Sequence, residues 1–165
     1  MWGSRDPWFG CISDGPYDAV TSHFLAGYLT VDATQIVLEP DPFRDAHISQ
    51  GFRVGDLIVL SGQVAMDENG QWDGGRDFDA QADQAMRNVQ RALRAAGSDV
   101  DKIFKVTIYL TDMKYRSNVI AMRRQWFREP WPADTLVAVA ALGTPERLIE
   151  IEVMALADGS IRTEG

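Results

Sequence analysis

Apolar and polar positions recur along this chain in patterns that predict five strands and two helices. Residues 78–96 place apolar side chains at spacings of three and four and stop before Gly97, as an amphipathic helix does. Residues 100–110 alternate with one wholly apolar face, which is typical of a strand covered by a helix. A second helix is predicted over 114–128, where Pro130 ends the pattern. The remaining strands are predicted over 35–39, 57–64, 135–142 and 147–157.

This order of elements predicts an α+β fold with the helices on one face of a mixed sheet. We divide the chain into an irregular N-terminal extension (1–33), one folded domain (34–158) and a C-terminal tail (159–165). The extension mixes aromatic residues with glycine, proline and aspartate at no sustained period, with one short helix near 19–26. We expect it to pack on its own domain or on a neighbouring subunit, the alternative being a mobile lid or an added segment.

The charge and hydropathy of the chain narrow the classes of partner. A net charge of -8 and an isoelectric point near 4.7 disfavour binding to a phosphate backbone, so no nucleic-acid partner is expected. No apolar run approaches the roughly 20 residues that a bilayer span needs. The N-terminus lacks a basic stretch followed by an apolar one, which leads us to expect a cytoplasmic protein without a membrane partner.

Metal and cofactor motifs are absent from the sequence. Cys11 is the only cysteine and His23 and His47 are the only histidines, so we predict no metal site. The chain has no phosphate-binding loop, no dinucleotide-binding glycine pattern and no nucleophilic-serine motif. We therefore expect no cofactor.

A series of short motifs resembles one known family over roughly residues 35–157. They are Leu60–Gln63, Asp79–Ala82, Asn88-Val89, Ala95–Gly97, Lys105–Leu110, Trp126-Phe127, Pro132-Ala133 and Ile149–Ala155. In order and spacing, apart from a shorter turn before Pro132, they resemble the Rid/YjgF family of reactive-intermediate deaminases. The resemblance implies a chorismate-mutase-like subunit with a mixed six-stranded sheet and two helices on one face. It also implies a homotrimer with a barrel-like centre and ligand pockets in the clefts between subunits.

The resemblance transfers the functional residues of the deaminases only in part. In those enzymes an arginine directly after the Pro-Ala pair holds the substrate carboxylate, while a glutamate and a serine position water and substrate. Glu150 matches the glutamate and Ser61 matches the serine, but Asp134 stands at the arginine position. The segment that carries a further tyrosine aligns with Ala46-His47-Ile48.

An aspartate at that position reverses the charge offered to a substrate. Asp134 would repel a carboxylate, so we expect substrates other than 2-aminoacrylate. If Asp134 and Glu150 share a pocket, their repulsion raises one pKa and creates an acid and base pair. We take Glu150, Asp134 and His47 as the catalytic candidates. The substrate-binding candidates are Ser61, Gly62, Ile48, Trp131 and Thr135.

Each candidate also has a purely structural interpretation. Asp134 could be a solvated residue paired with an arginine such as Arg53 or Arg147. Ser61 could be a small residue that packing requires beside Gly62, and His47 could be an ordinary surface histidine.

The sequence supports two hypotheses about function. The first is a trimeric hydrolase or deaminase acting on a reactive imine, enamine or related small C–N compound. The alternative is a non-catalytic trimer that binds a small metabolite or a partner protein in its clefts. A third activity ascribed to some family members, RNA cleavage, conflicts with the charge of -8.

Overall fold

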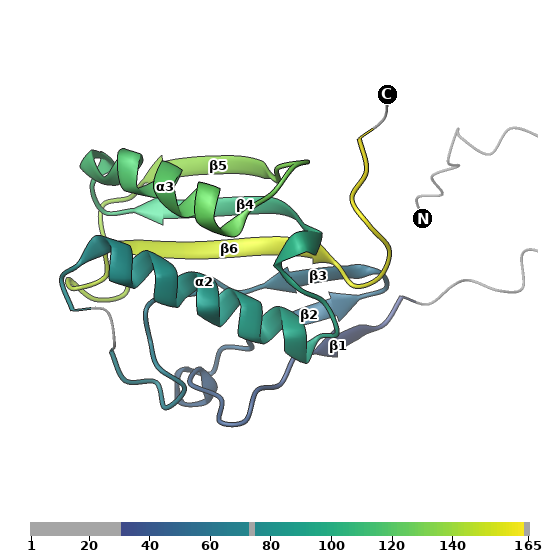
Figure 1. Cartoon of the computed structure of the whole chain (residues 1–165). Helices are drawn as coiled ribbons and strands as arrows, with labels where there is room; N and C mark the ends of the chain where they lie inside the picture. The colour runs from purple at the N-terminus through teal and green to yellow at the C-terminus, as the bar shows by residue number, and fades with distance from the viewer. Residues whose placement is uncertain (1–30, 73–74, 164–165) are drawn as a thin grey trace, which may run out of the picture. The chain divides into compact units, whose positions relative to one another are not determined.

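The computed structural model describes residues 31–72 and 75–163, which form a six-stranded sheet with two α-helices on one face (Figure 1). The elements are β1 (Ala33–Gln35), β2 (Gly51–Val54), β3 (Leu57–Leu60), α2 (Phe78–Ala95), β4 (Ile103–Leu110), α3 (Arg116–Trp126), β5 (Ala133–Ala138) and β6 (Ile149–Leu156). The strands lie in the order β1-β2-β3-β6-β4-β5. Among the strands described, only β4 and β5 pair in parallel. The α+β fold with a mixed six-stranded sheet is therefore confirmed.

Two of the strand predictions need correction. Alternation alone does not predict β2, because its four residues begin with Gly51 and are too short for a period to emerge. The strand expected over 35–39 is wrong beyond its first residue: β1 ends at Gln35, and Ile36 donates a last backbone hydrogen bond to Gly51 O (2.9 Å). The chain then leaves the sheet.

The other boundaries shift by a few residues, because local capping competes with the periodic pattern. The strand expected over 100–110 begins with a 3-10 turn (Val100–Lys102), whose Val100 N–H donates to the Asp99 side chain (2.7 Å). The helix expected over 114–128 likewise starts with a 3-10 turn (Met113–Tyr115). The strands expected over 57–64, 135–142 and 147–157 are observed as β3, β5 and β6.

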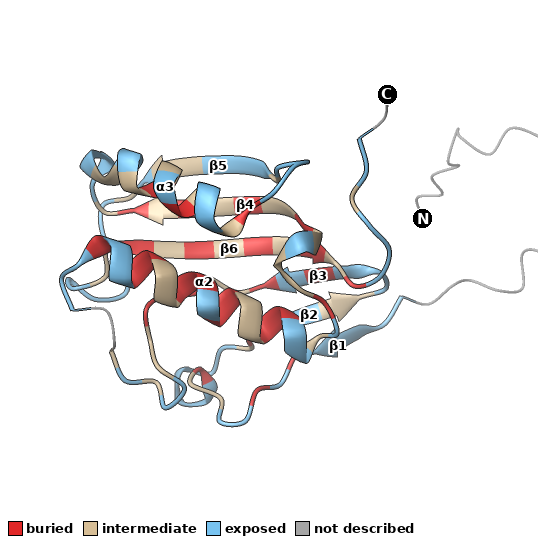
Figure 2. Cartoon of the chain, in the orientation of Figure 1, coloured by how far each residue is buried: buried red, intermediate tan, exposed pale blue. Residues whose placement is uncertain are grey.

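Helix α2 follows its sequence signals closely. The Asp77 side chain accepts a hydrogen bond from Ala80 N (2.8 Å), which caps the first turn, and Gly97 at φ +80° follows the last one. Met86 and Leu93 of the predicted stripe are fully buried against the sheet, and Ala96 at its end is partly buried. Figure 2 shows this stripe facing the strands.

The two faces of the sheet differ sharply in composition. Alternate residues of the central strands, such as Val106 on β4 and Ile151 on β6, are fully buried under the helices. The residues between them, including Glu150 and Glu152, point to the opposite face. That face also carries the exposed apolar side chains Phe52, Leu57 and Val59. We call it the open face.

The N-terminal extension and its expected helix lie outside the described residues, apart from residues 31–33. Residues 159–163 of the expected tail form no helix or strand. The proposed domain boundaries stay a prediction.

Candidate active site

A pocket of about 280 Å³ lies where β3 ends beside the start of β6. Four of the candidate residues line it: Ile48, Ser61, Gly62 and Glu150. The other lining residues are Pro42, Phe43, Ala46, Val64, Met66, Gly143 and Arg147. Residues distant in sequence meet here because Gln63 and Ile151 exchange backbone hydrogen bonds (2.8 and 2.9 Å). We call this the Glu150 pocket.

Glu150 is the acidic side chain of this pocket. It is half-buried, and it lies so close to Gly62 that a Cβ atom there would overlap its carboxylate. Burial raises the pKa of Glu150, an effect that Arg147 partly opposes and Glu152 reinforces. A carboxyl group with a raised pKa is a stronger base once it is deprotonated.

Ser61 is held in place by its neighbours on the adjoining segment. Its hydroxyl donates to Ser49 O (2.7 Å), and its backbone N–H donates to Gln50 O (2.9 Å). Gln50 is fully buried and donates in turn to Asp41 Oδ1 (2.7 Å). The serine oxygen therefore keeps its lone pairs available to accept a hydrogen bond from a bound molecule.

Arg147 is a pocket residue that sequence reasoning considered only as a partner for Asp134. Buried Gln81 on α2 fixes the backbone on both sides of it: Gln81 Nε2 donates to Glu146 O (3.0 Å), and Leu148 N donates to Gln81 Oε1 (2.8 Å). No local sequence signal placed Arg147 beside Glu150, because residues three apart in an extended segment point to opposite faces.

Asp134 lies away from the Glu150 pocket in the same subunit. On β5 it stands beside the buried Val106 of β4, so its side chain points to the helix-covered face. There it pairs with Arg123 of α3, which donates from Nε to Oδ2 (2.8 Å) and from Nη2 to Oδ1. The partner expected for Asp134 was Arg53 or Arg147, but Arg53 pairs with Asp158 (2.8 Å).

The shared Asp134 and Glu150 pocket is thus not formed within a subunit, because strand alternation sends the two side chains to opposite faces of the sheet. Asp134 instead lines a separate hollow of about 350 Å³ with Trp131. Trp131 is 68% exposed.

We expect Asp134→Asn to lower the free energy of unfolding by roughly 1 kcal/mol, since the bidentate pair with Arg123 is only partly exposed. Urea denaturation measures this effect. The matched control is Asp158→Asn, which breaks the more exposed pair with Arg53 and should cost less. Equal losses of unfolding free energy in the two variants would show that the Asp134 pair stabilises the fold no more than the exposed pair does.

The remaining candidates lie at the margins of the pocket or beyond them. His47 is exposed at the end of the 3-10 turn Arg44–Ala46, and its neighbours Ala46 and Ile48 line the pocket while it does not. Thr135 is on the open face, where its hydroxyl accepts from Lys105 Nζ (3.0 Å).

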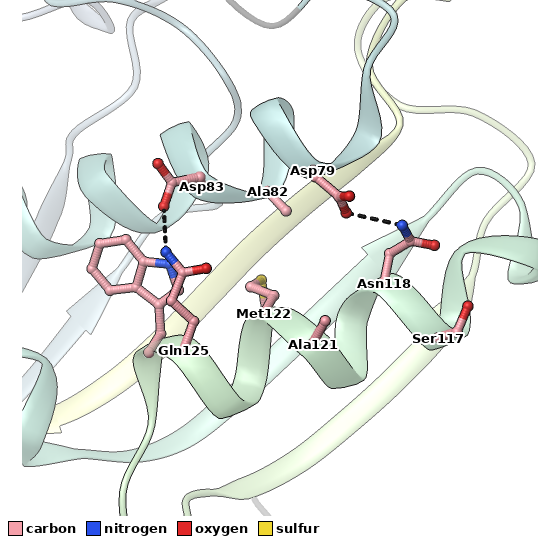
Figure 3. A pocket seen from close by; sticks show the side chains of 9 residues that line it. Asp79, Ala82, Asp83, Ser117, Asn118, Ala121, Met122 and Gln125 are labelled. Atoms are coloured by element: carbon pink, nitrogen blue, oxygen red, sulfur yellow. Dashed lines mark hydrogen bonds between the residues drawn. The ribbon is translucent and has the colours of Figure 1, made fainter.

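A further hollow of about 350 Å³ separates α2 from α3 and contains none of the candidate residues (Figure 3). Hydrogen bonds bridge the two helices across it. Asn118 Nδ2 donates to Asp79 Oδ1 (2.9 Å), and Gln125 Nε2 donates to Asp83 Oδ1 (3.2 Å). With their acceptors engaged in this way, these side chains join the two helices.

Residues 31–72 and 75–163 contain neither a metal-binding cluster nor a membrane-spanning helix. No group of three His, Cys, Asp or Glu side chains there is arranged to hold a metal ion. None of the helices described in this part of the chain combines the length and apolarity that crossing a membrane requires.

Comparisons with known proteins identify a consistent set of relatives. Residues 39–157 match a family described as endoribonuclease L-PSP. The chain is 35% identical to the RutC family protein y4sK of Sinorhizobium fredii, over 72% of this chain and 97% of that protein. It is 37% identical to the human 2-iminobutanoate/2-iminopropanoate deaminase, over 66% of this chain and 78% of that enzyme.

Solved structures give the same answer for the fold. The conserved Rid family protein YyfA from Yersinia pestis superposes with a TM-score of 0.70 at 28% identity, covering 76% of this chain and 99% of that one. RidA from the Antarctic bacterium Psychrobacter sp. PAMC 21119 superposes with a TM-score of 0.68 at 29% identity, covering 74% and 98%.

Proposed function

Because the chain belongs to the Rid/YjgF family, also described as endoribonuclease L-PSP, we propose that it hydrolyses the C=N bond of a small reactive imine or its enamine tautomer. The imine and one water molecule give a carbonyl compound and ammonia. One observation carries this proposal: Glu150, with its raised pKa, lies half-buried beside Ser61 in a pocket sized for a small molecule.

The pocket residues can be assigned steps of this reaction. Deprotonated Glu150 accepts a proton from water as the oxygen attacks the imine carbon, and the proton then passes to the nitrogen. Glu150 then takes the hydroxyl proton of the resulting carbinolamine and passes it to the nitrogen, and cleavage of the C–N bond releases ammonia and the carbonyl product. The oxygen of Ser61 accepts a hydrogen bond from the substrate N–H and so orients the carbon towards the water.

The endoribonuclease description of the family is a poorer fit to this chain. Arg147 is the only basic side chain among the described residues that line the Glu150 pocket. The chain as a whole carries a charge of -8. Binding to a polyanion depends on several basic side chains neutralising phosphates, and this pocket cannot supply them.

We also propose that the protein assembles as a homotrimer through the open face. Phe52 and Leu57 are each 39% exposed there and Val59 is 42% exposed, on a face that no described helix covers. Strand β5 is an edge of the sheet, so it is free to approach a neighbouring subunit. Clefts formed in this way would bring Thr135 and Trp131 of one subunit towards the Glu150 pocket of the next.

We expect native mass spectrometry to give three times the 18.4 kDa mass of the chain. Val59→Lys places a charge in the centre of the proposed interface and should yield monomer. Arg87→Lys on the outer face of α2 should leave the trimer intact. A monomeric wild-type protein would contradict the assembly.

The proposed activity is tested with imines formed in place by an amino-acid oxidase or an amine oxidase, with catalase present. We expect the protein to shorten the lifetime of the imine, measured by trapping the remaining imine with semicarbazide. If no imine is consumed faster while a 2-oxo acid still binds to the pocket, the protein is a binding trimer and not a hydrolase.

A further inference from the structure

Arg147 is in an unusual position for an arginine side chain. Among the described residues it forms no ion pair, and its buried Nε has no hydrogen-bond acceptor. Its Nη2 donates only to the neutral sulfur of Met66 (3.5 Å). A guanidinium group has five N–H donors, and leaving them unmatched in a partly buried site costs free energy. An anionic ligand would supply the missing acceptors.

The side chain is also fixed in place. Gln81 holds the peptide groups on both sides of Arg147, as described above. Nη1 lies against Gly143 so closely that a Cβ atom there would overlap it. A guanidinium held in this way is preorganised, so little side-chain entropy is lost when a ligand binds.

We propose that Arg147 binds the carboxylate of a 2-imino acid or its enamine tautomer, in place of the family arginine that Asp134 replaces. This inference rests on the proposed imine hydrolysis at the same pocket. In a 2-imino acid the carboxylate carbon is bonded directly to the imine carbon. A carboxylate held by Arg147 therefore brings the imine carbon close to Glu150, and Arg147 offsets the repulsion between the two carboxylates.

The position of Asp134 supports this assignment. The family arginine that would hold a carboxylate is replaced here, and in this subunit Asp134 is engaged by Arg123 on the opposite face of the sheet. The charge of Asp134 would exclude carboxylate substrates only if its side chain faced the substrate. Arg147 lines the pocket within the subunit and supplies the positive charge instead.

A matched pair of substrates tests the proposal. Leucine and an amino-acid oxidase give 2-imino-4-methylpentanoate, whereas isopentylamine and an amine oxidase give the same imine without its carboxylate. We expect Arg147→Met to lower kcat/KM for the imino acid by about 100-fold at pH 8. For the neutral imine, kcat/KM should change less than about twofold at the same pH. The kcat/KM of Arg147→Lys for the imino acid should be intermediate, because lysine keeps the positive charge but lacks the paired N–H donors of the guanidinium group. The control Arg87→Met should match the wild type on both substrates.

The pH profile separates this role from a purely structural one. Arg147 lowers the pKa of Glu150, while Glu152 raises it and Tyr109 lies beside it on β4. Removing the guanidinium should therefore move the acid limb of neutral-imine hydrolysis to higher pH. Circular dichroism would check that the variant is folded.

The outcomes distinguish this proposal from the proposed function. Equal losses on both imines in Arg147→Met, or a wild type that prefers the neutral imine, would overturn the carboxylate assignment and leave imine hydrolysis standing. If neither imine is consumed, the proposed function fails. Calorimetry with 2-oxo-4-methylpentanoate then still tests Arg147: wild-type binding at least tenfold tighter than that of Arg147→Met supports it, and equal affinity overturns it.

Discussion

Glu150→Gln is expected to lower kcat/KM for imine hydrolysis by about 10²–10⁴-fold, the range typical of a lost general base. Glutamine has nearly the same shape but cannot accept the proton from water. Because burial raises the pKa of Glu150, wild-type activity should fall on the acid side with a midpoint above the ordinary value of 4.5. Steady-state rates between pH 4 and 9 measure both effects.

A second variant displaces the Glu150 carboxylate without changing its chemistry. In Gly62→Ala the added Cβ meets the Glu150 carboxylate and its adjoining carbons, so Glu150 must move aside. We expect activity to fall by roughly 100-fold, since small displacements of a catalytic group are costly. Near wild-type rates in both Glu150→Gln and Gly62→Ala would show that Glu150 takes no part in the mechanism.

Although Glu150→Gln should lower activity, we expect it to raise the stability of the fold above neutral pH. A carboxyl group whose folded pKa is raised destabilises the folded state above that pKa, and this cost disappears as the pH falls below the unfolded value of 4.5. Glu150→Gln should therefore raise the urea midpoint at pH 8 and leave it unchanged near pH 4. A lower midpoint at pH 8 would mean that the charged carboxylate stabilises the fold.

Gln81→Met is expected to lower the free energy of unfolding by about 3 kcal/mol, the largest stability loss that we predict. Methionine fills the space but leaves the Leu148 N–H and the carbonyls of Glu146 and Gly75 without their partner. Each unsatisfied buried group costs about 1–3 kcal/mol, and local rearrangement recovers part of the total. Urea denaturation measures the change.

The control for this variant is Gln90→Met on the same helix, where a single hydrogen bond to Asp99 (2.8 Å) is lost. It should cost about 1 kcal/mol. Gln81→Met should also weaken the binding of 2-oxo acids, because the loop that carries Arg147 is no longer fixed. Unchanged affinity would show that the loop keeps its shape without Gln81.

Part of the site could be predicted from the sequence because it depends on short motifs. Ser61, Gly62 and Glu150 lie in segments whose residue types and spacing resemble the Rid/YjgF family, and the structure brings them together with Ile48. His47 was placed by the same alignment, yet its side chain does not line the pocket. An alignment locates a backbone position and not the direction of its side chain.

The sequence by itself determined the elements whose signals are local. Helix α2 has its capping Asp77, its apolar stripe and its terminal Gly97 within one continuous segment. Strand β6 alternates over its eight residues, and β4 alternates from Lys105 to Leu110, after a register shift at its start. Periodicity reports such elements because each residue's environment repeats along the chain.

Only the tertiary structure decided which charged groups meet. Asp134 could face either side of the sheet until its pairing with Val106 turned it towards Arg123. Arg147 enters the pocket because Gln81, distant in sequence, holds its loop. Contacts of this kind follow from strand register and long-range hydrogen bonds, which no local pattern of residues specifies.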